Sequence, residues 1–317
     1  MTQLPAADNP FLAGKTRPIV VGHRGVPLLH QENTLAGFRR AVALGLDAVE
    51  LDVRITADRR AVCVHDSNLE RLTGSARNVV DVTWSELSRL RVRRELPMGQ
   101  DATGERVVAR YDREEPIPLL EQVLDEVATA LVVNVELKIG LPRWWQLEAA
   151  AIVARVIADA KVQDRVIVTS FDPRMLMATR RAHRDIFVGF CFDDTMLNFA
   201  GGLLDRLPAF PVELDQHHRR RGHNARRLLN RLLETDVAGR LFGTRVVGAD
   251  HTLVGRRTVD ALHRQGVAIG THTLFPIAAI KPIATTAATI AEVERLVRLG
   301  VDWIETDDPV RLQRLIG

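Results

Sequence analysis

The sequence predicts one (β/α)8 barrel with insertions over residues 16–317, after an N-terminal extension over residues 1–15. Three observations predict this fold. Apolar runs rich in β-branched residues alternate along the chain with helical patterns, which is typical of a parallel sheet. Residues 44–52 are echoed by residues 299–307, and each segment is a helix end, a glycine and a strand. The length of 317 residues also suits such a barrel, which takes about 250 residues plus insertions.

The alternation contains nine candidate strands, whereas a closed barrel needs eight. The candidates cover residues 19–22, 48–53, 61–64, 131–136, 166–169, 186–191, 246–249, 267–270 and 303–305. The gap between the second and third candidates is too short for a helical crossover. Either one of these two is a hairpin extension or its crossover helix is missing, and the sequence leaves both open.

Helix signals support the barrel. Leu120, Val123, Leu124 and Val127 recur at the spacing that lines one face of a helix. The end signals are a capping box at Thr83 and Glu86, N-caps before proline at Asp172 and Asp308, and stops at Gly45 and Gly300. Residues 205–245 break the alternation with prolines and a run of arginines, and we interpret them as a basic insertion within the barrel.

The composition favours a globular protein of a reducing compartment. Hydrophobic content of 46% and charged content of 26% argue against disorder. The sequence has no apolar run of the length that a bilayer requires and no signal-peptide pattern at its start, so we expect a cytoplasmic protein. Cys63 and Cys191 each lie in an apolar run, which indicates buried thiols rather than a disulfide.

Charged residues cluster at the ends of two predicted strands. Glu50 and Asp52 are two residues apart, as are Glu136 and Lys138, so each pair points to one face of its strand. Paired carboxylates on an apolar strand call for a cation or a shared proton, and hard oxygen ligands favour Ca²⁺ or Mg²⁺. The alternatives are a solvated strand end for the first pair and a plain ion pair for the second.

Two histidines follow other predicted strands. His23 and Arg24 end the first strand and His65 ends the third, so both imidazoles would reach the mouth of the barrel that holds the carboxylates. Imidazole can donate or accept protons near neutral pH, and Arg24 can bind a phosphate bidentately. A single histidine at a strand end is more often structural, but two that converge with acids favour catalysis.

These residues form a long ordered pattern that resembles the glycerophosphodiester phosphodiesterase family. The pattern runs through Gly22-His23-Arg24-Gly25, Glu32-Asn33-Thr34, Phe38, Ala41, Gly45, Asp47, Glu50-Leu51-Asp52-Val53, Thr56, Asp58, His65-Asp66, residues 117–121, 135–138, 169–172 and 300–302, and Thr306-Asp307-Asp308-Pro309. The resemblance covers nearly the whole chain and implies a (β/α)8 barrel that hydrolyses glycerophosphodiesters to glycerol 3-phosphate and an alcohol through a cyclic phosphate.

The resemblance also implies a role for each site residue. It makes His23 and His65 the acid and base, Glu50, Asp52 and Glu136 the ligands of one divalent cation, Ca²⁺ or Mg²⁺, Arg24 and Lys138 the phosphate contacts, and Glu32, Asn33 and Asp307 supporting residues. The chain departs from the family pattern at Gln31, at Gly270-Thr271-His272-Thr273 and at Glu305. These departures put the identity of the substrate in question more than the reaction.

Several alternatives remain open. An apolar stripe flanked by arginines within residues 217–233, together with Trp144 and Trp145, motivates the hypothesis of a lysophospholipid substrate met by peripheral contact with a membrane. A phospholipase D-like activity and a non-catalytic barrel that binds phosphodiesters are the other candidates. Nucleic acid is not expected as a partner, because the formal charge is only +3 and no aromatic residues are interleaved with the arginines.

Overall fold

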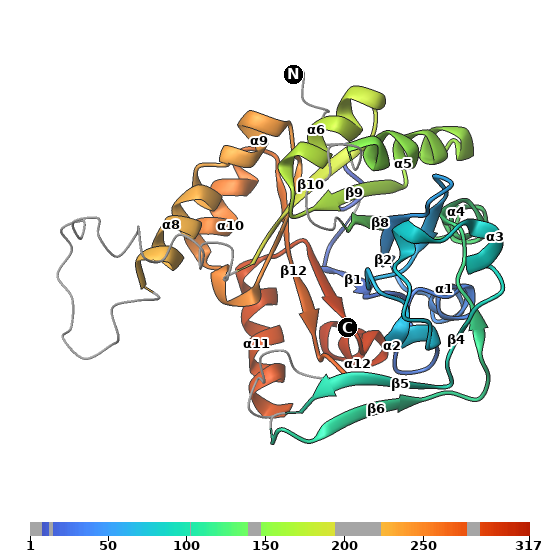
Figure 1. Cartoon of the computed structure of the whole chain (residues 1–317). Coiled ribbons are helices and arrows are strands. Elements are labelled where there is room, and N and C mark those ends of the chain that lie inside the picture. The colour runs from blue at the N-terminus through green and yellow to red at the C-terminus, as the bar shows by residue number, and fades with distance from the viewer. Residues whose placement is uncertain (1–7, 13–14, 102, 139–146, 194–222, 278–285) are drawn as a thin grey trace.

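A closed barrel of eight parallel strands forms the centre of the protein, as a computed structural model shows (Figure 1). The structure describes residues 8–12, 15–101, 103–138, 147–193, 223–277 and 286–317. The barrel strands are β1 (Ile19–Gly22), β2 (Ala48–Ile55), β8 (Val132–Leu137), β9 (Val166–Ser170), β10 (Phe187–Phe192), β11 (Val246–Ala249), β12 (Ala268–Leu274) and β13 (Trp303–Thr306). Parallel pairing of β1 with both β13 and β2 closes the barrel.

The ninth candidate strand is a hairpin extension. Strand β3 (Ala61–Cys63) pairs antiparallel with β2, with Val53 opposite Cys63. It lies at the outer end of the sheet order and takes no place in the closed barrel. The structure therefore decides between the two possibilities that the short gap before residue 61 left open.

Helices cover the outside of the barrel, and their ends follow the predicted signals. The helices that alternate with the barrel strands are α1 (Leu35–Ala43), α4 (Leu120–Val127), α5 (Leu147–Ala160), α6 (Pro173–Ala182), α8 (His223–Glu234), α9 (Val237–Phe242), α10 (Arg256–His263), α11 (Thr286–Leu299) and α12 (Pro309–Ile316). Asp172 and Asp308 cap helices that begin with proline, as predicted. All four apolar residues of the predicted stripe on α4 are buried.

Alternate residues of each barrel strand point inward. Near the amino ends of the strands the inward side chains, Ile19, Ala48, Val132, Ile167, Phe187, Val246, Ala268 and Trp303, form a core of their own with Phe11. The residues between them pack instead with the surrounding helices. Phe11 belongs to the predicted N-terminal extension, and its ring lies 5.4 Å from that of Trp303, centroid to centroid. The amino end of the barrel is therefore filled, which leaves the carboxyl end for a site.

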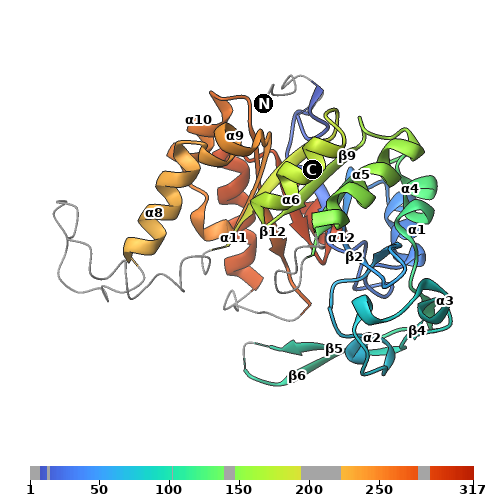
Figure 2. The same cartoon turned by 45° about the horizontal axis from the view of Figure 1, so that its top comes forward.

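A small lobe between β3 and α4 is the largest feature that the sequence analysis missed. It contains α2 (Glu70–Thr73), the 3₁₀ turn η2 (Val79–Asp81), α3 (Trp84–Leu87), β4 (Arg91–Val92), β5 (Glu95–Gln100), β6 (Arg106–Arg110) and β7 (Glu115–Pro116). Figure 2 shows these elements set to one side of the barrel. The lobe has a separate apolar core that includes Leu72, Leu87 and Leu96. The predicted capping box of Thr83 and Glu86 starts α3.

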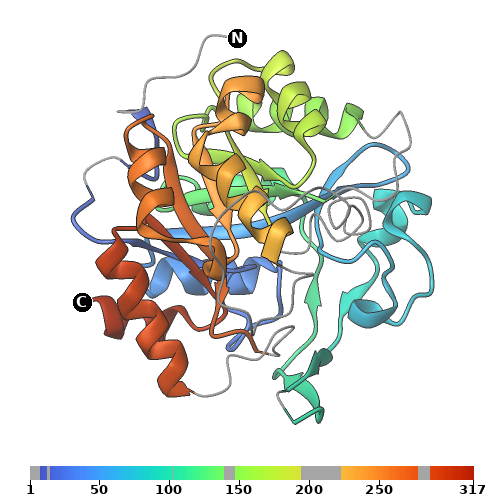
Figure 3. The ribbon, with the colours of Figure 1, turned by 90° about the vertical axis from the view of Figure 1, so that its left-hand side faces the viewer.

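Only the second half of the predicted insertion at residues 205–245 is described. Helix α8 packs beside α9 and α10 on the outside of the barrel (Figure 3). On α8, Leu229 and Leu233 are buried in the main core. Part of the apolar stripe that motivated membrane contact through residues 217–233 therefore covers the barrel. Trp144 and Trp145 lie outside the described residues.

Two further expectations concern the cysteines and membrane helices. Cys63 and Cys191 are both buried and free, as predicted, and burial raises the pKa of each thiol. Among the described residues, every helix is too short or too polar to span a bilayer.

We predict that alanine at Gly270 will destabilise the fold more than alanine at Gly248. A Cβ atom on Gly270 would lie 2.1 Å from Cδ2 of Trp303, whereas one on Gly248 would lie 3.0 Å from its Cη2. Overpacking of this kind costs about 1–3 kcal/mol, so Gly270→Ala should lower the free energy of unfolding by at least that amount. Urea denaturation of both variants measures it, and an equal loss for the two would contradict this packing.

Candidate active site

Three carboxylates meet at the carboxyl end of the barrel. Glu50 and Asp52 lie on inward positions of β2, and Glu136 lies opposite Asp52 on the neighbouring strand β8. One ligand oxygen from each of the three lies within 4.8 Å of the others. Glu50 and Asp52 are buried, with 2% and 0% of their surface exposed. The structure thus brings together the three residues that the sequence assigned to a cation, although they come from segments more than 80 residues apart in the chain.

Two basic side chains compensate this negative charge. The Lys138 ammonium lies 2.6 Å from Oε1 of Glu136 and 3.2 Å from Oδ1 of Asp52, and Arg24 Nε lies 3.1 Å from Oδ2 of Asp52. Although burial raises the pKa of Asp52, the charges of Lys138 and Arg24 lower it far below the usual range. Burial lowers the pKa of Lys138, but Asp52 and Glu136 raise it above its usual value. Lys138 and Arg24 therefore favour the ionised form of Asp52.

Glu50 has the opposite balance. Burial and the negative charge of Asp52 raise the pKa of Glu50 well above its usual range. Its Oε2 accepts a hydrogen bond from the backbone N–H of Arg24 at 2.9 Å, while its Oε1 is buried and has no hydrogen-bond partner among the described residues. A buried carboxylate oxygen without a partner is costly, and a bound cation would satisfy it.

Two residues in the left-handed region of backbone conformation shape the surrounding turn. Arg24 and Asn33 have φ angles of 53° and 56°. Asn33 donates from Nδ2 to Oδ2 of Asp52 at 2.8 Å and accepts at Oδ1 from the Asp52 backbone N–H at 3.0 Å. Backbone strain of about 1–3 kcal/mol per such residue persists only where the surroundings compensate it. Here the side chain of Asn33 holds the central carboxylate in place.

His23 is oriented by Asp307, which ends the last barrel strand. His23 Nδ1 lies 2.6 Å from Oδ1 of Asp307, so Nε2 remains for other contacts. Burial and Arg24 lower the pKa of His23, but Asp307 and Glu305 raise it to a net value above 6.5. Oδ2 of Asp307 accepts a hydrogen bond from the Ile277 backbone N–H, which holds this carboxylate in turn.

His65 has the same arrangement with a different acid. Its Nδ1 lies 2.8 Å from Oδ1 of Asp66, and its backbone carbonyl accepts a hydrogen bond from Arg54. The backbone N–H of Val64, the residue before His65, donates to the Asp52 carbonyl at 2.9 Å, so His65 follows directly on a segment that pairs with β2 at the central carboxylate. Each imidazole therefore has one nitrogen occupied by an acid and the other directed elsewhere.

A chain of ion pairs connects the two histidine segments. Arg24 binds Glu32 at 3.1 Å, Arg71 binds both oxygens of Glu32 at 2.7 and 2.9 Å, and Arg71 binds Asp66 at 2.5 Å. Glu32 is only 2% exposed, so the two arginines around it are needed to offset the cost of burial. Glu32 was expected as a supporting residue from the sequence, whereas Arg71 was not. No local spacing marked it, because its partners lie 5 and 39 residues away.

Glu305 is a further carboxylate of the site, and the direction of its side chain was open at the level of sequence. It points inward, is 4% exposed, and has its Oε1 3.9 Å from Nε2 of His23. One ligand atom each from His23, Glu50 and Glu305 lies within 4.8 Å of the others. Burial raises the pKa of Glu305. Thr273, from the segment that departs from the family pattern, donates to its Oε1 at 3.4 Å.

The donor set suits a hard divalent cation. The acidic groups around Glu50 offer carboxylate oxygens, and neither buried cysteine belongs to a ligand cluster of the described residues. Oxygen ligands of this kind are preferred by Ca²⁺ and Mg²⁺, whereas zinc sites use more histidine and cysteine. Glu50, Asp52 and Glu136 would hold the ion. Its positive charge would then neutralise part of the negative charge that Lys138 neutralises in its absence.

Comparisons with known proteins identify the family of the chain. The sequence profile of the glycerophosphoryl diester phosphodiesterase family matches residues 23–311. A glycerophosphodiester phosphodiesterase of Caldanaerobacter subterraneus subsp. tengcongensis is 30% identical over 176 residues, which cover 56% of this chain and 67% of that protein. A lysophospholipase D of Mus musculus is 34% identical over 120 residues, 38% of this chain and 36% of that one.

Two solved structures share the fold. A glycerophosphodiester phosphodiesterase from Parabacteroides distasonis has a TM-score of 0.63 at 19% identity, covering 95% of this chain and 98% of that one. An Oleispira antarctica phosphodiesterase in complex with the product sn-glycerol-3-phosphate has a TM-score of 0.63 at 19% identity, covering 94% and 96%. With the profile match over nearly the whole chain, these findings show that the chain belongs to the glycerophosphoryl diester phosphodiesterase family.

Proposed function

We propose that the protein hydrolyses glycerophosphodiesters to glycerol 3-phosphate and an alcohol, with one bound Ca²⁺ or Mg²⁺. The observation that carries the proposal is the convergence of Glu50, Asp52 and Glu136 at the carboxyl end of the barrel, where the segments that follow β1 and β3 each carry an imidazole paired with its own aspartate. The Oleispira antarctica relative was solved with the product sn-glycerol-3-phosphate, which supports the same product class here.

The arrangement suits cleavage in two steps. In the first, one imidazole removes the proton of the glycerol 2-hydroxyl, whose oxygen forms a bond to phosphorus while the alcohol leaves and takes a proton from the other imidazole. In the second, water opens the cyclic phosphate, with the two imidazoles in exchanged roles. Asp307 and Asp66 keep each ring oriented, which is the function of the acid in other acid-base catalytic pairs.

The phosphate would lie between the cation and the basic side chains. Arg24 and Lys138 lie beside Asp52 and can contact non-bridging oxygens of the diester. The cation supplies charge neutralisation and orientation when it is bound. Two alternatives stay predictions: lysophospholipid or phospholipase D-like turnover at a membrane surface, and phosphodiester binding without catalysis. A panel of soluble glycerophosphodiesters and lysolipids separates them from the main proposal.

Removing either imidazole should abolish turnover while the fold persists. We expect His23→Ala and His65→Ala each to lower kcat/KM for glycerophosphodiesters by at least about a hundredfold, the lower end of the contribution of a positioned acid or base. His263→Gln is the matched control, since His263 pairs with Asp302 and contacts none of the site residues in the described structure. Unchanged turnover in either alanine variant would refute the proposed mechanism.

Removing a carboxylate should weaken cation binding whatever happens to turnover. We expect Glu136→Gln to raise the dissociation constant for Ca²⁺ or Mg²⁺ at least about tenfold, because even indirect partners of metal ligands contribute that much. Titration calorimetry measures the binding, and a rise in thermal stability on adding the ion measures it independently. The control is Glu95→Gln, an exposed carboxylate that pairs with Arg110 on β5 and β6.

Asp307→Asn should lower the pKa of His23. The wild-type pKa lies above 6.5 because the charge and hydrogen bond of Asp307 outweigh burial and Arg24. With the carboxylate gone, the limb of the pH profile of kcat/KM that belongs to His23 should shift to lower pH, and NMR titration of the imidazole should report the same shift. An unchanged His23 pKa would show that Asp307 does not set it.

A further inference from the structure

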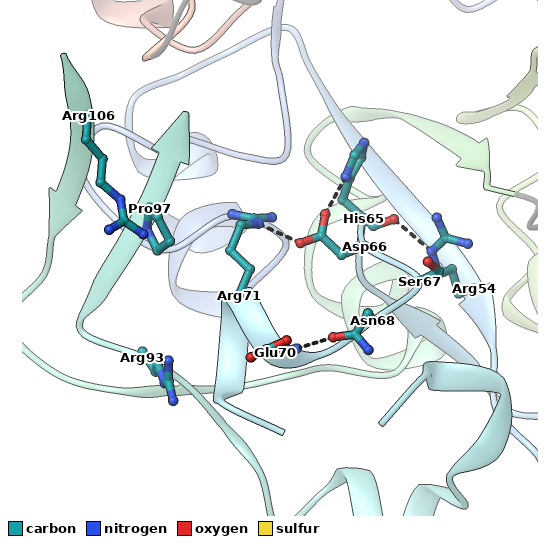
Figure 4. A pocket seen from close by; sticks show the side chains of 10 residues that line it. All are labelled: Arg54, His65, Asp66, Ser67, Asn68, Glu70, Arg71, Arg93, Pro97 and Arg106. Carbon is teal, nitrogen blue, oxygen red and sulfur yellow. Dashed lines mark hydrogen bonds and ion pairs between the residues drawn. The ribbon is translucent and has the colours of Figure 1, made fainter. Parts of the chain in front are cut away.

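A pocket of about 710 Å³ lies between the barrel mouth and the lobe (Figure 4). Its walls come from β2, the segment that follows β3, α2, and strands β5 and β6 of the lobe. His65 lines it, so one of the two proposed catalytic imidazoles faces this space. The pocket therefore adjoins His65, and most of its remaining lining comes from the segment around α2 and from the lobe.

Four arginines dominate the pocket wall. They are Arg54, Arg71, Arg93 and Arg106, and the acids that line the pocket with them among the described residues are Asp66 and Glu70. Arg71 is also bound by the buried Glu32, so the four guanidinium groups face three carboxylates, and the positive charges exceed the negative ones by one. In Figure 4, Arg54 lies at one end beyond His65, and Arg106 lies at the other end on the lobe.

One of these arginines is already neutralised. Arg71 binds Asp66 and both oxygens of the buried Glu32, and Asp66 is shared with His65. Arg54, Arg93 and Arg106 differ from it, because no acidic side chain of the described residues lies within ion-pair distance of their guanidinium groups. Arg54 is half-buried, and burial lowers the pKa of its guanidinium. An anionic ligand would compensate these charges.

Arg93 lies against α2 through both its side chain and its backbone. Gly74 has a φ of +84°, and a Cβ atom there would lie 1.8 Å from Nη2 of Arg93. The guanidinium therefore packs close to the glycine backbone, where a larger residue would displace this end of the arginine side chain. The backbone of Arg93 is tied to α2 by a hydrogen bond from its N–H to the Leu72 carbonyl at 2.8 Å.

We infer that this pocket binds the alcohol half of the substrate and selects alcohols that carry an anionic group, a phosphate or a carboxylate. The inference rests on the proposed function, and it deepens it by naming the class of alcohol. The pocket adjoins His65, the imidazole beside which the alcohol oxygen would leave, and guanidinium groups match phosphate and carboxylate geometry. A quaternary ammonium alcohol such as choline meets net positive charge there and is disfavoured.

Three glycerophosphodiesters with the same two-carbon alcohol test the inference. Their alcohols are 2-hydroxyethyl phosphate, ethylene glycol and choline, which differ chiefly in charge. We expect kcat/KM to fall in that order, with at least about a tenfold preference for the phosphate over the uncharged alcohol, the factor that corresponds to about 1.4 kcal/mol. The preference should shrink as salt rises from 50 to about 300 mM, because exposed charges are screened.

Variants assign the preference to the lobe. In the double variant Arg93→Gln with Arg106→Gln, the two substrates should become nearly equivalent. We expect kcat/KM for the phosphate substrate to lie within about threefold of kcat/KM for the ethylene glycol substrate, because interactions of exposed charges account for only small differences once these arginines are gone. Turnover of the ethylene glycol substrate should fall much less than turnover of the phosphate substrate. Arg110→Gln, on the same strand as Arg106 but outside the pocket, is the matched control. A flat charge series, choline in first place, or an equal loss on both substrates would overturn the inference.

A binding measurement separates this inference from the proposed function. We expect the wild-type protein to bind 2-hydroxyethyl phosphate in calorimetry. The double variant should bind it at least about tenfold more weakly, because it lacks two of the charged side chains that contact the phosphate. If no diester is turned over, the proposed function fails, while this difference in binding would still support the pocket. If the double variant binds equally well, the pocket assignment fails. If inorganic phosphate binds as tightly through the same arginines and the diesters show no charge order, the pocket takes free phosphate and the alcohol assignment is overturned.

Discussion

The ionised carboxylate of Asp52 is the interaction on which the rest of the site depends. Its side chain is buried completely in the barrel mouth, where an unpaired ion would cost several kcal/mol. Arg24, Lys138 and Asn33 all contact it and keep it charged. Burial and the negative charge of Asp52 together raise the pKa of its neighbour Glu50. One carboxylate of the pair is thereby fixed as an anion, and the other is left in need of a cation.

The same charges connect the barrel with the lobe. Glu32, between Arg24 and Arg71, belongs to a buried ion network that runs from the His23 segment to Asp66 and His65. A network of this kind holds its members in one geometry, because removing any one would leave a buried charge unpaired. The lobe is thus attached next to the imidazole that faces its arginine pocket. Tyr111 adds a second attachment, since its buried hydroxyl donates to the Pro27 carbonyl at 2.7 Å.

The barrel interior divides into two parts with different chemistry. At the amino end, Trp303 and Phe11 fill the space that Gly248 and Gly270 leave open, so this end is a packed apolar core. At the carboxyl end, the inward positions two and four residues farther along the strands carry acids and a histidine. Glu305 lies just two residues after Trp303 on β13 and belongs to this polar end. A strand alternates its side chains strictly, so this change from apolar to acidic within one strand places the site along the barrel axis.

The barrel, its strands and the charged residues at the strand ends were predictable from the sequence, because strand alternation and strand-end position are local properties that a linear pattern displays. The spacing of Glu50 and Asp52, or of Glu136 and Lys138, already predicts one shared face. The sequence could not predict the lobe, because the elements at residues 70–116 are short and their core forms only when they fold on one another.

Three features depended on contacts between distant segments: the role of β3, the inward direction of Glu305, and the pairing of Arg71 with Glu32 and Asp66. The sequence therefore determines which residues lie at the ends of the strands. Only the closed barrel decides which of them meet, since closure brings the first strand against the last and sets the lobe beside His65.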